Sequence, residues 1–186
     1  MISFREILLE DAEKLLQWRL QPRIAEWMLT AVENDTCKQR AWLTKKREDS
    51  GGYHWIVQIK SIDVGYVKME NYDAPKRSAE VGFYIGEERY TATAVGVLHA
   101  FYAALFSHFE LDNILAGIFE GNIIMKIHQF SGYERDFSRE VLVIEGPPPK
   151  IMVPYVLSRE VFQHKHPCKN VPNLPMALWN GCGFKA

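Results

Sequence analysis

The stretch from Ala79 to Phe109 joins a strand-like run to a long apolar helix, and it carries polar residues suited to binding an anion. Between them lies Arg89-Tyr-Thr-Ala-Thr-Ala94, where Arg89 adds positive charge and Thr91 and Thr93 add hydroxyl donors. Amides at a helix start lack intrahelical partners, and together with the helix dipole they favour a phosphate. The segment alone fits either an ordinary capped helix after a loop or a phosphate-binding loop, and the order of the other elements has to decide between them.

Length, charge and cysteine usage limit the class of protein. A chain of 186 residues suits one domain and can bury a substantial core. A formal net charge of -1 argues against a general nucleic-acid or membrane-surface binder, although it leaves room for a local basic patch. Charges follow Met1 at once and no apolar run approaches membrane-spanning length, so neither a signal peptide nor a membrane span is expected. The scattered Cys37, Cys168 and Cys182 favour reduced thiols and a cytoplasmic location.

The hydrophobic pattern predicts the elements that position the loop. Alternating or continuous apolar runs predict strands at residues 2–8, 54–59, 64–70, 79–85, 113–119, 139–144 and 151–157. Helical spacing and capping residues predict helices at about residues 11–20, 24–28, 36–50, 94–109 and 122–131. This order mixes antiparallel hairpins with a βαβ crossover, so the expected fold class is α/β (α+β).

The regular pattern ends near His164. We therefore expect a domain over residues 1–162 and a C-terminal extension of unknown role, a tail or a dimer strap, over residues 163–186. His164, His166 and Cys168, with Cys182 further on, hint at a metal site. Because their spacing matches no strong zinc pattern, no metal is predicted.

Five short segments form an ordered set of motifs within residues 1–162. In chain order they are Ile62 to Tyr66, Ala79 to Gly86, Arg89-x-x-Ala92-x-Ala94, Asn113 to Asn122, and His128 to Tyr133. In this order they resemble the Gcn5-related N-acetyltransferase (GNAT) family: the turn into its third strand, its fourth strand, its coenzyme loop, its fifth strand with an Asn turn, and its Gly-aromatic ending. The resemblance implies a mixed, mainly antiparallel central sheet flanked by helices, with splayed fourth and fifth strands.

The resemblance also implies a coenzyme site for acetyl-CoA as acyl donor. The backbone of the splayed fourth strand would hold the acetyl group and pantetheine, the loop would hold the pyrophosphate, and Asn122 would either bond the coenzyme or cap a helix. Ala92 stands where the family has glycine, which adds a methyl group close to the pyrophosphate. The expected coenzyme-binding residues are Gly82, Phe83, Tyr84, Arg89, Thr91, Ala92, Thr93, Ala94 and Asn122.

The family's chemistry is direct attack of an amine on the thioester carbonyl, which needs a base for the amine and an acid for the thiolate. Glu80 is expected to be the base, acting through a water, and a strand glutamate in a surface ion pair is the alternative. His128 is expected to be the acid, and a helix-surface histidine is the alternative. Tyr133 is a second candidate acid unless it belongs to the core.

The N-terminal helices resemble a subgroup that acetylates nucleotide-linked aminosugars, of the pseudaminic-acid pathway type. Trp18-Arg19, Pro22, Ile24 and Met28 to Thr30 carry this likeness, which ribosomal-protein N-acetyltransferases share. Arg19, Met28 and Gln39 are the expected substrate contacts, and Arg19 could pair with a nucleotide diphosphate. Gln39 stands where the aminosugar enzymes often carry a histidine.

The expected function is acetyl transfer to a primary amine of a small molecule, with a nucleotide-linked aminosugar as the favoured acceptor. No nucleic acid or membrane partner is expected, and a homodimer is left open. Three alternatives stand beside this prediction. They are a protein N-terminal acetyltransferase, a non-catalytic acyl-CoA-binding module, and an interaction domain whose cleft is filled by side chains.

Overall fold

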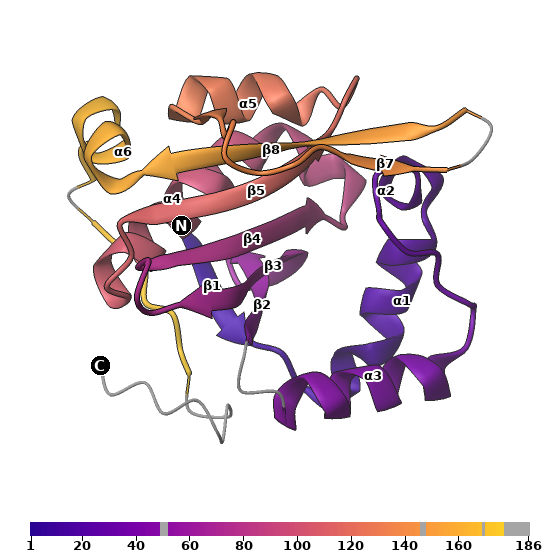
Figure 1. Cartoon of the computed structure of the whole chain (residues 1–186). Helices are drawn as coiled ribbons and strands as arrows, with labels where there is room; N and C mark the ends of the chain where they lie inside the picture. Colours follow the sequence, from indigo (N-terminus) through magenta and orange to yellow (C-terminus); the bar gives the residue numbers. More distant parts are fainter. Residues whose placement is uncertain (49–51, 146–147, 169, 177–186) are drawn as a thin grey trace.

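A computed structural model describes residues 1–48, 52–145, 148–168 and 170–176 of the chain (Figure 1). Its centre is an eight-stranded sheet in the order β1-β2-β3-β4-β5-β8-β6, with β7 also paired to β8. The strands are β1 Ile2–Glu6, β2 Gly52–Ile59, β3 Ile62–Asp73, β4 Ser78–Ile85, β5 Asn113–Phe119, β6 Glu134–Arg135, β7 Leu142–Ile144 and β8 Lys150–Ser158. The helices are η1 Leu9–Asp11, α1 Ala12–Leu20, α2 Pro22–Ala25, α3 Thr36–Glu48, η2 Glu88–Thr93, α4 Ala94–His108, α5 Ile124–Ser131 and α6 Arg159–Lys165.

The strands β4 and β5 form a parallel pair that opens after three residues. Their register runs from Ser78 opposite Asn113 to Glu80 opposite Leu115, whereas the other paired strands are antiparallel. β4 continues to Ile85, so its second half pairs with β3 on one edge and has no β5 partner on the other. The predicted mixed, mainly antiparallel sheet with splayed fourth and fifth strands is confirmed.

Helices cover both faces of this sheet. Trp55 and Phe101 are in ring contact, which places α4 on the face of the odd-numbered side chains of β2. His54 points the opposite way because side chains alternate along a strand, and its ring meets Trp42 of α3. The segment Glu88–His108 is long and apolar enough to span a membrane by composition alone, but half of it is buried, as in a core helix. The two layers share one hydrophobic core.

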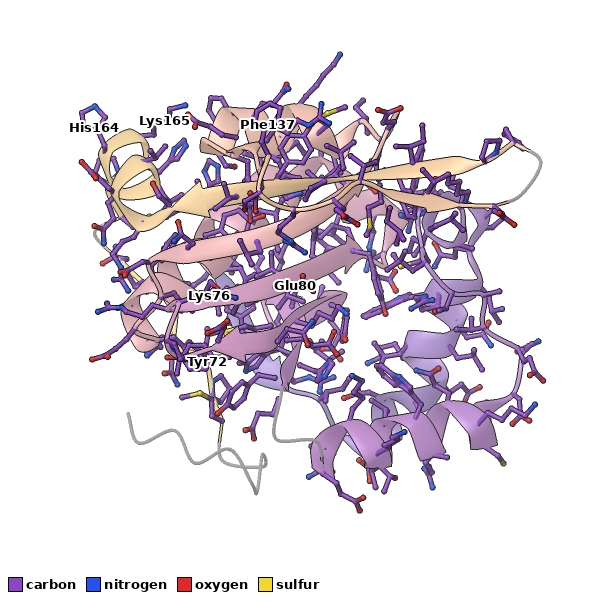
Figure 2. All side chains as sticks on the ribbon, in the orientation of Figure 1. Tyr72, Lys76, Glu80, Phe137, His164 and Lys165 are labelled. Atoms are coloured by element: carbon purple, nitrogen blue, oxygen red, sulfur yellow. The ribbon has the colours of Figure 1, made fainter. Side chains whose placement is uncertain are left out.

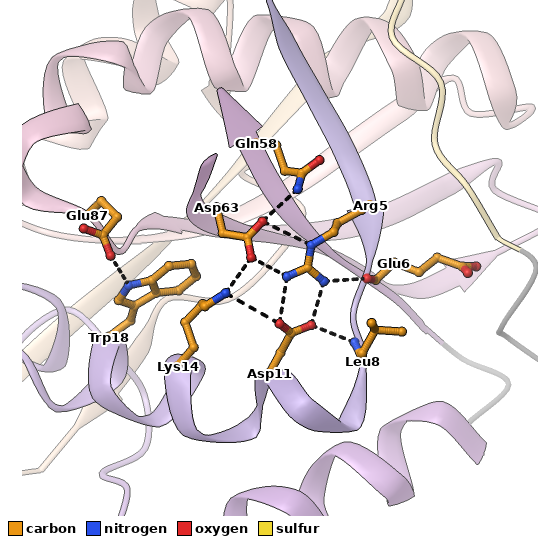
Figure 3. A network of polar contacts seen from close by, with 9 residues as sticks. All are labelled: Arg5, Glu6, Leu8, Asp11, Lys14, Trp18, Gln58, Asp63 and Glu87. Carbon is orange, nitrogen blue, oxygen red and sulfur yellow. Dashed lines mark hydrogen bonds and ion pairs between the residues drawn. The ribbon is translucent and has the colours of Figure 1, made fainter. Parts of the chain in front are cut away.

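A polar network fixes α1 to the sheet (Figure 3). Arg5 of β1 donates to both carboxylate oxygens of Asp11, at 2.7 Å each, and to Asp63 of β3, which also pairs with Lys14. In the helix predicted at about residues 11–20, Asp11 would stand first, at the capping position. Instead, its carboxylate accepts the Leu8 backbone N–H and the Arg5 guanidinium and makes no capping bond to α1, because the η1 turn comes first.

The chain after β8 forms a helix, α6, that the sequence pattern did not predict. α6 crosses the expected boundary between residues 162 and 163, and the side chain of Leu174 is 2% exposed. The indole N–H of Trp55 donates to the Pro175 carbonyl at 2.8 Å, so the described part of the extension packs against the core. No group of three or more His, Cys, Asp and Glu is placed to hold a metal ion within the described residues; Cys182 lies outside them.

Candidate functional site

The predicted phosphate-binding loop forms the η2 turn, which leads without a break into α4. The backbone N–H of Ala94 donates to Thr91, so this amide already has a partner. The hydroxyl of Thr91 donates to the Glu88 carbonyl at 2.7 Å, and that of Thr93 to the Tyr90 carbonyl at 2.6 Å. Both hydroxyls would have to rotate to donate to a phosphate.

Ala92 and Arg89 of this loop are accessible to solvent. Ala92 is exposed, and its backbone φ is not positive. Its methyl group therefore strains no backbone angle. Arg89 is also exposed, and its guanidinium lies 5.1 Å from the centre of the Tyr90 ring. A guanidinium held only by a ring contact keeps its N–H donors available for a phosphate.

The end of β4 is held against α1 and α2 by close contacts at Gly86. Arg23 donates to the carbonyls of Ile85 and Gly86, at 2.9 and 2.6 Å, and Gln21 donates to Gly86 at 3.1 Å. A Cβ at Gly86 would lie 2.1 Å from the indole ring of Trp18, so only glycine fits there. These contacts fix the position at which the loop begins.

The unpaired half of β4 presents different side chains to its two faces. Phe83 meets the ring of His128 of α5 at 6.3 Å, on the α4 side of the sheet. Gly82 and Tyr84 face the other way; Gly82 lies under the Lys68 side chain, and Tyr84 stacks on Tyr66 at 5.1 Å. The β5-side edge of this half strand leaves backbone groups available to pair with an extended ligand arm.

His128, the expected acid, is buried rather than on the surface, so the surface alternative is wrong. Its Nδ1 lies 3.2 Å from the Tyr102 hydroxyl, and its ring packs against Tyr133. Burial lowers the pKa of His128 to about 4, so the imidazole is neutral at pH 7. Tyr133 is itself buried in the core. The acid role of His128 stays a prediction, and at neutral pH its donor would be the single N–H of the neutral ring.

Glu80, the expected base, is at the last paired position of β4, immediately before the strands separate. Its carboxylate forms an ion pair with Arg139 at 2.5 Å and accepts a hydrogen bond from the Asn71 side chain at 2.9 Å. Its side chain is 38% exposed, so solvent and a substrate can reach it. The ion pair foreseen as the alternative is thus present, and the role of base stays a prediction.

A comparison of the sequence with protein-family models identifies the family of this chain. The model of the acetyltransferase (GNAT) domain matches residues 2–128, which is more than half of the chain. The chain belongs to the GNAT acetyltransferase family. A search of curated proteins found no significant match. The expected family is confirmed, and the matched region contains four of the five motifs that predicted it, together with His128 of the fifth.

Solved structures share the fold at low sequence identity. A spermidine N-acetyltransferase from Vibrio cholerae, in complex with CoA and spermine, superposes with a TM-score of 0.76 at 13% identity, over 87% of this chain and 97% of that one. Mycobacterium smegmatis RimJ, in complex with CoA-disulfide, gives 0.71 at 16% identity over 86% and 82%. Apo FdhC, a nucleotide-linked sugar GNAT, gives 0.69 at 17% identity over 88% and 89%. The family and its CoA-bound members support acetyl-CoA as the acyl donor.

The expected acceptor contacts lie on the α1–α3 side of this GNAT domain. Arg19 of α1 donates to the Thr30 carbonyl at 2.8 Å, and its Nε is buried without a partner among the described residues. Met28 packs against the core, and Gln39 is half-buried on α3. Asn122 is placed elsewhere: it accepts the Ile124 N–H at 3.0 Å at the start of α5, which matches its capping alternative.

A row of polar side chains lies beneath α3, and the sequence analysis did not predict it. His54 is fully buried, its Nδ1 lies 2.5 Å from the Tyr66 hydroxyl, and its Nε2 lies 3.6 Å from Glu70. Lys46 and Lys68 both pair with Glu70. Burial raises the pKa of Glu70, but these lysines outweigh that effect and lower it to about 2. Polar residues at alternate positions of β2 and β3 were the available signal, since they mark one face of both strands.

Replacing Arg89 with alanine is expected to weaken acetyl-CoA binding about fivefold, because an exposed guanidinium–phosphate contact is worth about 1 kcal/mol. Calorimetric titration with acetyl-CoA measures the dissociation constant. Arg40→Ala is the matched control, since Arg40 is also exposed and lies on α3. Equal affinity in both variants would remove Arg89 from the coenzyme site.

Proposed function

We propose that this GNAT protein transfers the acetyl group of acetyl-CoA to a primary amine on a small acceptor that also carries negative charge. A nucleotide-linked aminosugar, such as an intermediate of the pseudaminic-acid type, is the favoured class. The observation that carries the proposal is the charge on the α1–α3 side of the sheet. In the cluster of described residues around Glu70 and Glu80, these two carboxylates are accompanied by four cations, namely Arg19, Lys46, Lys68 and Arg139.

Arg19 is the cation best placed to meet the acceptor. Burial raises the pKa of both Tyr66 and Tyr84, and the charge of Arg19 opposes that rise in each, so the guanidinium lies near both phenols. Its Nε lacks a partner among the described residues. A planar guanidinium beside hydroxyl groups is suited to a phosphate or carboxylate, since it donates two parallel hydrogen bonds.

The acceptors of other GNAT structures help to rank the alternatives. Spermine, bound in the Vibrio cholerae enzyme, is a polycation and would be repelled by an excess of arginine and lysine. FdhC is a nucleotide-linked sugar GNAT, and at 17% identity its likeness supports the fold alone. The competing proposal is acetylation of a protein N-terminus.

The exposed thiols bear on where the protein works. Cys37 and Cys168 are free cysteines on the surface. Exposed free thiols persist most readily where glutathione and thioredoxin keep them reduced. They support the further proposal that the protein acts in the cytoplasm, where its acyl donor is also available.

An acceptor screen tests the function. Release of the CoA thiol would be followed with a nucleotide-linked aminosugar, spermidine and a short peptide with a free N-terminus. We expect the highest kcat/KM with the aminosugar, and we expect it to fall as salt is added because screening weakens charge attraction. A preference for spermidine would overturn the proposal, and a preference for the peptide would favour the competing one. Tight acetyl-CoA binding without turnover of any amine would indicate a non-catalytic module.

A further inference from the structure

A loop of residues 136–141, here named the cover loop, crosses one face of the sheet. It joins β6 to β7, and both pair with β8 along the edge that β5 does not use. Yet Arg139 of this loop reaches Glu80 on β4, beyond both β8 and β5. Since neighbouring strands lie about 4.8 Å apart, the loop and the arginine side chain must arch over β8 and β5. Figure 1 shows the loop passing across β8, and Figure 2 marks Phe137 on it and Glu80 on β4.

The side chain of Arg139, within the cover loop, contacts the carboxylate of Glu80, the residue expected to act as base. One oxygen of Glu80 accepts from Nη2 of Arg139 and the other from the Asn71 amide. Both oxygens therefore already have a donor, at the position where β4 and β5 separate. Each oxygen of an ionised carboxylate has two lone pairs, so each Glu80 oxygen keeps one open acceptor site beside its present donor.

The contact between Arg139 and Glu80 is poorly suited to a permanent structural role. It uses one donor rather than the two-donor fork, and Nη1 of Arg139 is buried with no partner among the described residues. The two side chains are 34% and 38% exposed, so solvent screens the pair. Phe137, Ser138, Glu140 and Val141 of the cover loop are exposed, which leaves little packing to resist its movement.

We propose that Arg139 determines acceptor specificity by exchanging Glu80 for the phosphate or carboxylate of the acceptor as it binds. The exchange gives Nη1 a partner, because a phosphate accepts both parallel N–H groups of the fork. It also opens a second acceptor site on one Glu80 oxygen as the amine arrives. An acceptor without an anionic group leaves the ion pair in place. This inference rests on the proposed function and specifies how the same site selects its substrate.

The chemical step balances with the groups present. The ammonium of the acceptor gives one proton to Glu80, directly or through a water, and the free amine attacks the thioester carbonyl carbon. The C–N bond forms and the C–S bond breaks, and the second proton lost by the attacking nitrogen passes to the CoA thiolate, which leaves as the thiol. Arg139 is not consumed and touches only the anionic group of the acceptor.

The test compares a phosphorylated aminosugar with the same sugar lacking the phosphate. We expect wild-type kcat/KM to favour the phosphorylated amine at least about tenfold, as one charged hydrogen-bonded contact allows. Arg139→Gln should reduce that ratio about tenfold by slowing the phosphorylated amine. Arg139→Lys should restore part of it. Glu80→Gln should slow both amines while acetyl-CoA affinity stays the same.

Arg135→Gln is the matched control. Arg135 is the last residue of β6, directly before the cover loop, and its guanidinium lies over the Phe137 ring. Among the described residues, the ion-pair partner of Glu80 is Arg139 and not Arg135. Arg135→Gln should keep the wild-type ratio. If the wild-type protein prefers the phosphorylated amine and Arg139→Gln keeps that preference, the proposed function stands and the role of Arg139 is refuted. If the wild type shows no preference, both fail. If neither sugar is acetylated, calorimetry decides, and equal affinity of wild type and Arg139→Gln for the phosphorylated sugar refutes the inference.

Discussion

Gly86→Ala is expected to lower the free energy of unfolding by about 3 kcal/mol, the upper range for forcing a methyl group into a packed site. The added Cβ would lie 2.1 to 2.4 Å from three ring atoms of Trp18. Gly86 cannot retreat, because its N–H donates to the Val64 carbonyl at 2.8 Å and its own carbonyl accepts from Gln21 and Arg23. For a chain of this length the loss corresponds to a fall in Tm of roughly 6–12 °C.

The same substitution is expected to weaken acetyl-CoA binding, because the η2 loop starts two residues after Gly86 and its position depends on this contact. Thermal unfolding and calorimetry measure the two effects. Adding Trp18→Leu should recover part of the lost stability by removing the clashing ring. The effects of two substitutions on the free energy of unfolding do not add when the residues are in contact. Non-additivity would therefore show that the loss comes from the clash with Trp18 and not from replacing glycine as such.

Gly96→Ala is the matched control. Gly96 is exposed on α4, and the nearest atom to an added Cβ is the Ile2 side chain at 3.5 Å, an ordinary contact. Alanine is the better helix former, so this variant should gain up to about 1 kcal/mol. If Gly86→Ala unfolds at the wild-type temperature, the close approach of Trp18 to Gly86 is wrong.

Local patterns in the sequence predicted most of the fold that surrounds the η2 loop. The strand Asn113–Phe119 has the predicted bounds, and the helix Ala94–His108 ends one residue before its expected end. Both carry a strong apolar period, and each is bounded by a polar or turn residue. The strand expected at residues 139–144 is shorter, because β7 begins at Leu142 and Arg139 belongs to the cover loop. No local pattern marks a two-residue strand such as β6.

The contact partners of the site residues could not be predicted from local sequence patterns. Glu80 and Arg139 are 59 positions apart, and they meet only because β6 and β7 share an edge of β8. His54 and Tyr66 meet across a hairpin, where pairing brings side chains of one face together. Residue types could be assigned to a family motif from the sequence, but whether a carboxylate is free or paired depends on tertiary contacts.

Arg5→Met is expected to cost about 3–5 kcal/mol of unfolding free energy at pH 7, the usual effect of removing one partner of a buried ion pair. The change leaves the carboxylates of Asp11 and Asp63, whose side chains are 7% and 16% exposed, with Lys14 as their remaining cation in the network. Methionine keeps most of the volume of the arginine stem, so the loss reports on charge more than on packing. Urea unfolding at several pH values measures it.

The effect of Arg5→Met on the free energy of unfolding should depend on pH. Burial raises the pKa of Asp63, but hydrogen bonds from Arg5, Lys14 and Gln58 outweigh it and hold that pKa well below its usual range. A carboxyl with a depressed folded-state pKa adds stability that is full above its unfolded pKa, about 4, and is lost as pH falls towards the folded value. Wild-type stability should therefore decline below about pH 4. In Arg5→Met the folded pKa moves back towards 4, so its curve is flatter and the two proteins converge in acid.

Arg77→Met provides the control for this convergence. Arg77 pairs with Asp112 on the surface, with side chains 47% and 53% exposed, and such a pair contributes at most about 1 kcal/mol. Its removal should leave the shape of the pH curve unchanged. A gap between wild type and Arg5→Met that widens in acid would contradict the network as drawn. Because α1 carries Trp18, which contacts Gly86 just before the η2 loop, loosening its attachment at Asp11 should also weaken acetyl-CoA binding, which Arg77→Met should leave intact.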